Sequence, residues 1–158
     1  MSNRGEVARA IAYFDTSDDV YELHRLTREI APRVKKQVKS LIAKGSEESI
    51  PAPADLYPAK SPATRQDALR IVKQTSDIAL LQALARSIGR RIEAVEIVAS
   101  ADFPEGCRVE VPEEVAFPPT ADYVAGAVRE SGTTLTVQLD NGERWVGPPS
   151  LARREGTA

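Results

Sequence analysis

The chain has 158 residues, of which 42% are hydrophobic and 28% charged, so it can bury a core as one domain or as two small domains. It has no apolar run near the roughly 20 residues of a membrane span. Its N-terminus, MSNRGEVARA, lacks an apolar signal segment, and its single cysteine, Cys107, excludes an internal disulfide. We therefore expect a protein of the cytoplasm, or of a particle assembled there, with no membrane partner.

Charge is divided unevenly along the chain. Residues 1–100 carry 16 Lys and Arg against 13 Asp and Glu, whereas residues 101–158 carry 5 against 10. The spacing of apolar residues also changes near residue 101, which predicts an α+β fold. An N-terminal helical region, with long basic helices and a three-helix unit, precedes a small antiparallel β-barrel. The expected segments are 1–49, a helical region for oligomerisation or docking; 50–61, a Pro-rich linker or strap; 62–101, the three-helix unit; 102–152, the barrel; and 153–158, a tail.

Two helices are predicted in the first segment. Residues 4–14 place Val7, Ile11 and Phe14 on one stripe. A second helix begins in DTSDD, with Thr16 or Ser17 as its N-cap, and runs to about Lys44. Pro32 predicts a kink or a break near residue 30. The second helix carries a nearly heptad stripe that predicts packing against a helix of this chain or of a partner subunit: Val20, Leu23, Thr27, Ile30, Val34, Val38 and Leu41.

The second helix is also basic. Between residues 24 and 44, Glu29 is the only acid, and the cations are Arg25, Arg28, Arg33, Lys35, Lys36, Lys39 and Lys44. This face is either solvated, or it binds phosphates, an acidic partner or the acidic barrel of a neighbouring subunit. The stretch has no aromatic residue, so no stacking platform for single-stranded nucleic acid is expected.

Residues 50–62, IPAPADLYPAKSP, contain four prolines and no periodicity, which predicts an extended segment. Two interpretations stay open. The segment is a semi-rigid spacer, or it is a strap that docks on a neighbouring surface through Ile50, Leu56 and Tyr57.

Residues 62–100 predict three short helices, the second ending at Gly89 and the third running from Ile92 to about Ser100. The stretch LARSIGRRIEAVEIV, residues 84–98, resembles a helix-turn-helix. However, Arg90 occupies a usually apolar turn position, and Glu93 and Glu96 on the second helix would repel phosphates. A helical packing unit is therefore favoured over DNA recognition.

After residue 101, Gly and Pro separate short valine-rich runs, which is typical of a small antiparallel barrel. The predicted strands are 108–111, 124–130, 133–139 and 144–146. The segment from 104 to 152, with GCRVEV, VAGAVRESGTTLTVQLDNGERW and PPSLAR in that order, is similar to SH3-like small barrels of the Tudor and KOW type. The resemblance implies a module that binds proteins or nucleic acids.

The hairpin TTLTVQLDNGERWVG decides where the only tryptophan, Trp145, points. A two-residue turn at Asn141-Gly142 would put it opposite Gln138, on a face available to a ligand. A three-residue turn with Gly142 in the left-handed region would put it opposite Val137 instead. Burial favours the second register, with a barrel core of Leu135, Val137, Leu139 and Trp145.

Catalysis has little support in the sequence. His24 is the only histidine, and no histidine lies near Cys107. There is no Gly-rich phosphate loop and no set of zinc ligands. We therefore expect no enzyme, no catalytic residues, no cofactor, no metal and no small-molecule ligand.

Two functions remain. The first is a non-enzymatic structural or interaction protein, a homo-oligomer or part of a multi-subunit assembly, analogous in architecture to phage-type virion connector, completion or accessory proteins. The alternative is a nucleic-acid-associated regulatory or packaging protein that uses the basic helix 24–44 and the weak helix-turn-helix at 84–98.

Overall fold

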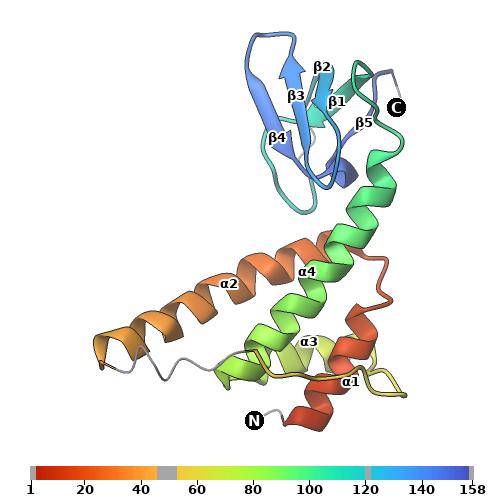
Figure 1. The fold of residues 1–158 in the computed structure, drawn as a ribbon. Coiled ribbons are helices and arrows are strands. Elements are labelled where there is room, and N and C mark those ends of the chain that lie inside the picture. The colour runs from red at the N-terminus through yellow and green to blue at the C-terminus, as the bar shows by residue number, and fades with distance from the viewer. Residues whose placement is uncertain (1–2, 46–52, 120–121, 157–158) are drawn as a thin grey trace. The chain divides into compact units, whose positions relative to one another are not determined.

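The computed structural model describes residues 3–45, 53–119 and 122–156 (Figure 1). The chain divides into two compact units, unit 1 from Met1 to Arg91 and unit 2 from Ile92 to Ala158. Four helices in the N-terminal part are followed by a five-stranded antiparallel sheet, which confirms the predicted α+β class. Unit 1 carries 16 Lys and Arg against 11 Asp and Glu, and unit 2 carries 5 against 12. Their net charges are therefore +5 and −7.

The first two helices are α1 (Arg4–Phe14) and α2 (Val20–Ala43). The side chain of Asn3 caps α1 by accepting a hydrogen bond from Glu6 N at 2.9 Å. Asp19 caps α2 in the same way, accepting from Glu22 N at 3.1 Å. The predicted N-cap at Thr16 or Ser17 is therefore wrong by two or three residues, because a carboxylate is available closer to the first turn.

α2 continues through Pro32, so the predicted break is wrong. Pro32 removes one helical hydrogen bond, but contacts on both sides of it hold the helix together. Ile30 is fully buried, and Arg33 donates hydrogen bonds to another helix of unit 1. Tertiary packing here outweighs the local cost of the proline.

The other helices of unit 1 are α3 (Arg65–Gln74) and α4 (Ile78–Ser100). α4 runs uninterrupted through Gly89, so the predicted three-helix unit has two helices and the helix-turn-helix at 84–98 is wrong. Gly89 does not adopt the positive φ that would end a helix. A helical glycine costs about 1 kcal/mol relative to alanine. Burial of Leu84 and Ile88 in the turns before it is worth more.

The described part of the Pro-rich segment, residues 53–64, has no regular structure and is held against unit 1 by its backbone. Ala59 N and Ala63 N donate to Ala8 O and Arg9 O of α1 at 3.1 and 3.0 Å, and Ala54 N donates to Ala79 O at 3.0 Å. Leu56 is half-buried, whereas Tyr57 is 81% exposed. The docking interpretation required Tyr57 to be covered, which is not the case; backbone hydrogen bonds hold the segment instead. Ile50 lies outside the described residues.

The sheet of unit 2 contains β1 (Arg108–Pro112), β2 (Tyr123–Glu130), β3 (Leu135–Leu139), β4 (Arg144–Gly147) and β5 (Arg153–Arg154), in the order β4-β3-β2-β1-β5. The first four strands agree with the predicted ones to within two residues. The predicted tail is wrong at its start, since β5 pairs with β1. Arg153 makes this pairing specific by contacting Glu110 at 3.2 Å and stacking over Tyr123. Closure of the sheet into an SH3-like barrel stays a prediction.

The hairpin of β3 and β4 has the register of the three-residue turn. Val137 lies opposite Trp145, and Gly142 has a φ of +90°. Trp145 is 5% exposed and shares the apolar face with Leu135, Val137 and Leu139, all of them buried. A Cβ atom at Gly147 would lie 2.6 Å from the Trp145 ring. A glycine at this position is therefore required by the packing of the indole.

We predict that Trp145→Ala lowers the free energy of unfolding of unit 2 by about 3–5 kcal/mol, because it removes the largest side chain of a small core and leaves a cavity. In the variant, the helical circular dichroism of unit 1 should persist, whereas the NMR signals of unit 2 should lose the dispersion of a folded domain. In the unaltered protein, Trp145 fluorescence should be blue-shifted and resistant to aqueous quenchers.

Trp145→Phe is the matched control. The indole Nε1 has no hydrogen-bond partner among the described residues, so phenylalanine gives up packing area alone and should cost clearly less than alanine. Equal losses for the two variants, or a readily quenched fluorescence, would contradict burial of the ring.

Candidate interaction surface

The apolar stripe of α2 divides into two parts. In the first half of the helix, Leu23, Leu26 and Ile30 are buried in unit 1. In the second half, Val34, Val38 and Leu41 are only half-buried and Ile42 is 46% exposed. Val20, at the start of the predicted stripe, is half-buried as well. The stripe therefore serves the core of unit 1 up to residue 30 and extends beyond that core.

Arg33 and Gln37 bind α2 to the residues at the end of α3. Its guanidinium donates to Val72 O at 2.9 Å and to Thr75 O at 2.7 Å, at the C-terminus of α3. Gln37 Nε2 donates to Ser76 O at 3.1 Å in the next turn. These carbonyls have no helical partner, and the negative end of the helix dipole favours a cation. Arg33, expected among the phosphate contacts, is therefore used inside unit 1.

We call residues 34–44 the α2 arm. After Gln37, none of its side chains hydrogen-bonds to another element in the part of the chain that the structure describes. Figure 1 shows this end of α2, in orange, extending away from α1 and α3. Val38, Leu41 and Ile42 thus form an apolar stripe on a helix end that the described residues of unit 1 leave partly exposed.

Lysines follow both edges of this stripe. At about 3.6 residues per turn, Lys35 and Lys39 lie beside Ile42 on one edge, and Lys44 lies beside Leu41 on the other. Lys36 lies on the opposite side of the helix. All four are exposed. Of the other predicted phosphate contacts, Arg28 is exposed nearer the start of α2, and Arg25 lines a cleft.

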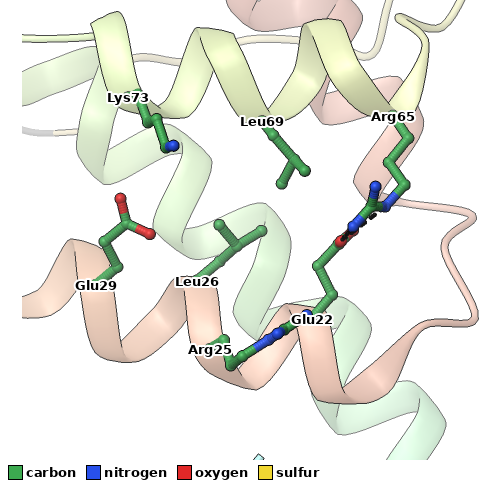
Figure 2. A pocket seen from close by; sticks show the side chains of 7 residues that line it. All are labelled: Glu22, Arg25, Leu26, Glu29, Arg65, Leu69 and Lys73. Atoms are coloured by element: carbon green, nitrogen blue, oxygen red, sulfur yellow. Dashed lines mark hydrogen bonds and ion pairs between the residues drawn. The ribbon is translucent and has the colours of Figure 1, made fainter.

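This cleft, of about 320 Å³, lies between α2 and α3 (Figure 2). Leu26 and Leu69 form its apolar middle, and Glu29 and Lys73 face each other at one end. At the other end, Arg65 Nε donates to Glu22 Oε2 at 2.8 Å. Three cations and two carboxylates line the cleft, so its charges do not favour either an anionic or a cationic ligand. We assign it a structural role.

Glu22 is the buried charge on which the α2–α3 packing depends. It is 3% exposed, and besides Arg65 it accepts a hydrogen bond from the Tyr13 hydroxyl at 3.5 Å. The hydrogen bond to Glu22 raises the pKa of Arg65, which stays charged. Burial and then the Glu22 carboxylate raise the pKa of Tyr13, which stays a donor. The sequence shows Glu22 as a first-turn acid, but its partner lies 43 residues away.

We predict that Arg65→Met lowers the free energy of unfolding of unit 1, because a buried carboxylate loses its counter-charge. The matched control is Arg70→Met on the same helix, whose ion pairs with Glu6 and Asp67 are long and exposed, at 3.5 and 3.6 Å. The Arg70 variant should change stability little. Equal denaturation midpoints for the two variants would contradict this role of Glu22.

In unit 2, a second buried acid caps a short helix. Glu96 is 1% exposed and accepts hydrogen bonds from Ser150 N at 2.8 Å and from Ser150 Oγ at 2.7 Å. Ser150 lies in the 3-10 helix Pro149–Leu151, whose first N–H groups need acceptors. The predicted exposure of Glu96 on a recognition helix is therefore wrong, since this carboxylate is part of the core of unit 2.

Arg108 of β1 joins the β3–β4 turn to the end of the chain. Its guanidinium donates to both carboxylate oxygens of Asp140, at 2.7 and 2.6 Å, and to Glu155 at 2.8 Å. These bonds raise the pKa of Arg108. The bidentate bond from Arg108 lowers the pKa of Asp140 below its ordinary value of 3.8.

We predict that Asp140→Asn destabilises unit 2 at neutral pH. The carboxyl has a lower pKa in the folded than in the unfolded chain, so its contribution is present above about 3.8 and disappears as the pH falls through the lowered value. The difference between variant and unaltered protein in urea midpoints should therefore shrink in acid. A difference that is independent of pH would contradict the ion pair.

Within the described residues, no three His, Cys, Asp or Glu side chains gather as a metal site requires, and no helix is long and apolar enough to cross a membrane. Comparisons of the chain with models of known protein families, with curated proteins and with solved structures gave no match.

Proposed function

We propose that this protein is a non-enzymatic interaction protein, a component of a larger protein assembly, and that the α2 arm is its docking surface. The observation that carries the proposal is the apolar stripe of Val38, Leu41 and Ile42, which continues the buried face of α2 beyond the hydrogen bond from Gln37 to Ser76 O and is partly exposed. Apolar residues at spacings of three and four on an exposed helix are how helices enter the grooves of protein partners.

The rest of unit 1 is suited to hold such an arm in place. Ile30 is buried and Arg33 donates a hydrogen bond to a carbonyl of α3, so the arm continues a helix that is packed in unit 1. This proposal keeps the architectural analogy with phage-type virion connector, completion and accessory proteins, and a setting in the cytoplasm or in a particle assembled there. Both rest on analogy and composition alone.

The arm also carries the charges on which a nucleic-acid function would depend. Lys35, Lys36 and Lys39 are exposed and could contact phosphates. However, Arg33 is used within unit 1, and α4 has no turn at which a recognition helix would begin. We therefore treat nucleic-acid binding as an outcome that the following experiment can reveal.

We predict that the protein forms species heavier than a monomer in light scattering at micromolar concentrations, and that Ile42→Asp returns it to a monomer. A charge on the stripe would be desolvated in the interface, but it is solvated in the free arm. In dilute solution the melting temperature of the variant should therefore equal that of the unaltered protein.

Ile30→Asp is the matched control on the same helix. Ile30 is fully buried, so this variant should lose several kcal/mol of folding stability at any concentration. The measurements are repeated with a DNA duplex over a salt series. A protein that stays monomeric at every concentration, or that gains mass only on DNA with a steep loss at high salt, would contradict the proposal.

A further inference from the structure

We infer that the α2 arm binds the acidic face of unit 2 in a second copy of this chain. The inference rests on the proposed function, since it names the partner of the same arm. It joins two surfaces that each copy carries, one on unit 1 and one on unit 2.

The receiving surface is a cleft of about 320 Å³ in unit 2, at the end of β1 and beside the β3–β4 turn. The surface of the cleft is mostly polar, and half-buried Val124 with buried Leu139 gives it a small apolar floor. Around this floor lie the exposed residues Glu113, Glu114, Asn141 and Glu143. The cleft is therefore chiefly an acidic surface with a small apolar floor.

Among the described residues, these three glutamates have no cation of their own unit beside them in an ion pair, unlike three other acids of unit 2. Glu110, Asp140 and Glu155 form ion pairs with Arg153 and Arg108. In the part of unit 2 that the structure describes, no ion pair involves Glu113, Glu114 or Glu143. Like charges gathered around one cleft repel one another, and cations brought from outside relieve that repulsion.

The arm has the complementary arrangement. Lys35, Lys39 and Lys44 lie on the two edges of its stripe and can face the glutamates, and Ile42 can face the small apolar floor. The whole units are complementary too, with net charges of +5 and −7. Pairing of two arms would bring six or more lysines together, which costs free energy and disfavours that alternative.

An arm on one copy and a cleft on the next make a heterologous contact, because the two surfaces are different. In an open chain, one end copy keeps a free arm and the other a free cleft until a ring closes, and the smallest ring is a two-fold dimer with two such contacts. We therefore expect the average mass to grow with concentration until a ring has closed. Raising the salt from about 0.1 M to about 1 M shortens the screening length from about 10 Å to about 3 Å and should weaken the association.

The test measures self-association of full-length variants by sedimentation velocity over a concentration series. Lys39→Glu in the arm and Glu113→Lys in the cleft should each raise the concentration of half-association about tenfold or more. The matched controls are Lys36→Glu, on the far side of the arm, and Glu105→Lys, an exposed acid of unit 2 outside the cleft. Both controls should associate like the unaltered protein, and melting curves check that every variant is folded.

Mixing identifies the partner surface. An equal mixture of the Lys39→Glu and Glu113→Lys proteins contains an intact arm on one and an intact cleft on the other, so association should return. The two substitutions combined in one chain should also restore it, because the charges are exchanged.

The inference would be overturned if the Glu113→Lys protein associated like the unaltered protein, or if the mixture failed to associate. If Ile42→Asp still abolishes association in that case, the arm is a docking surface for something other than the cleft, and the proposed function stands. If Ile42→Asp also associates normally, the proposed function fails with it.

Discussion

The contact between the Arg33 guanidinium and the last carbonyls of α3 is the constraint on which the form of unit 1 depends. It supplies the cation that the end of α3 lacks, and it does so from the residue that follows Pro32 in α2. Together with the burial of Ile30, it holds the chain helical across a residue that would otherwise interrupt it. The apolar stripe of α2 is therefore buried in its first half and partly exposed in its second half, although the helix continues without a break. The proposed docking surface is thus an extension of a core helix.

Charge has separate roles inside and outside the two cores. Glu22 and Glu96 are buried acids, each satisfied by hydrogen-bond donors from distant parts of its own unit. The lysines of the arm and the glutamates of the cleft are exposed. The buried carboxylates position elements within a unit, since an unsatisfied buried charge is costly. The exposed charges are available for partners, and this availability connects the uneven charge of the two units with the proposed assembly.

Features determined by neighbouring residues could be predicted from the sequence. The bounds of α1, the four longer strands and the place of Trp145 in the hairpin follow from local periodicity and from the turn that Gly142 permits. Gly89 led to a wrong prediction of a helix end, because packing along α4 outweighs the local preference of glycine. The roles of Glu22, Arg33 and Glu96 depend on partners that lie 39 to 54 residues away in the chain. The basic stripe could therefore be found in the sequence, but not which of its cations stays exposed.

The continuity of α4 connects the two units in folding. Unit 2 contains only the last nine residues of this helix, from Ile92 to Ser100, and Glu96 lies among them. Isolated helices shorter than about 12–15 residues are marginal in water, because the first turn is costly to nucleate. These nine residues belong to a helix of 23 residues, so the cost of nucleation is shared with the turns in unit 1. The position of the Glu96 carboxylate that meets Ser150 therefore depends on a helix to which both units contribute.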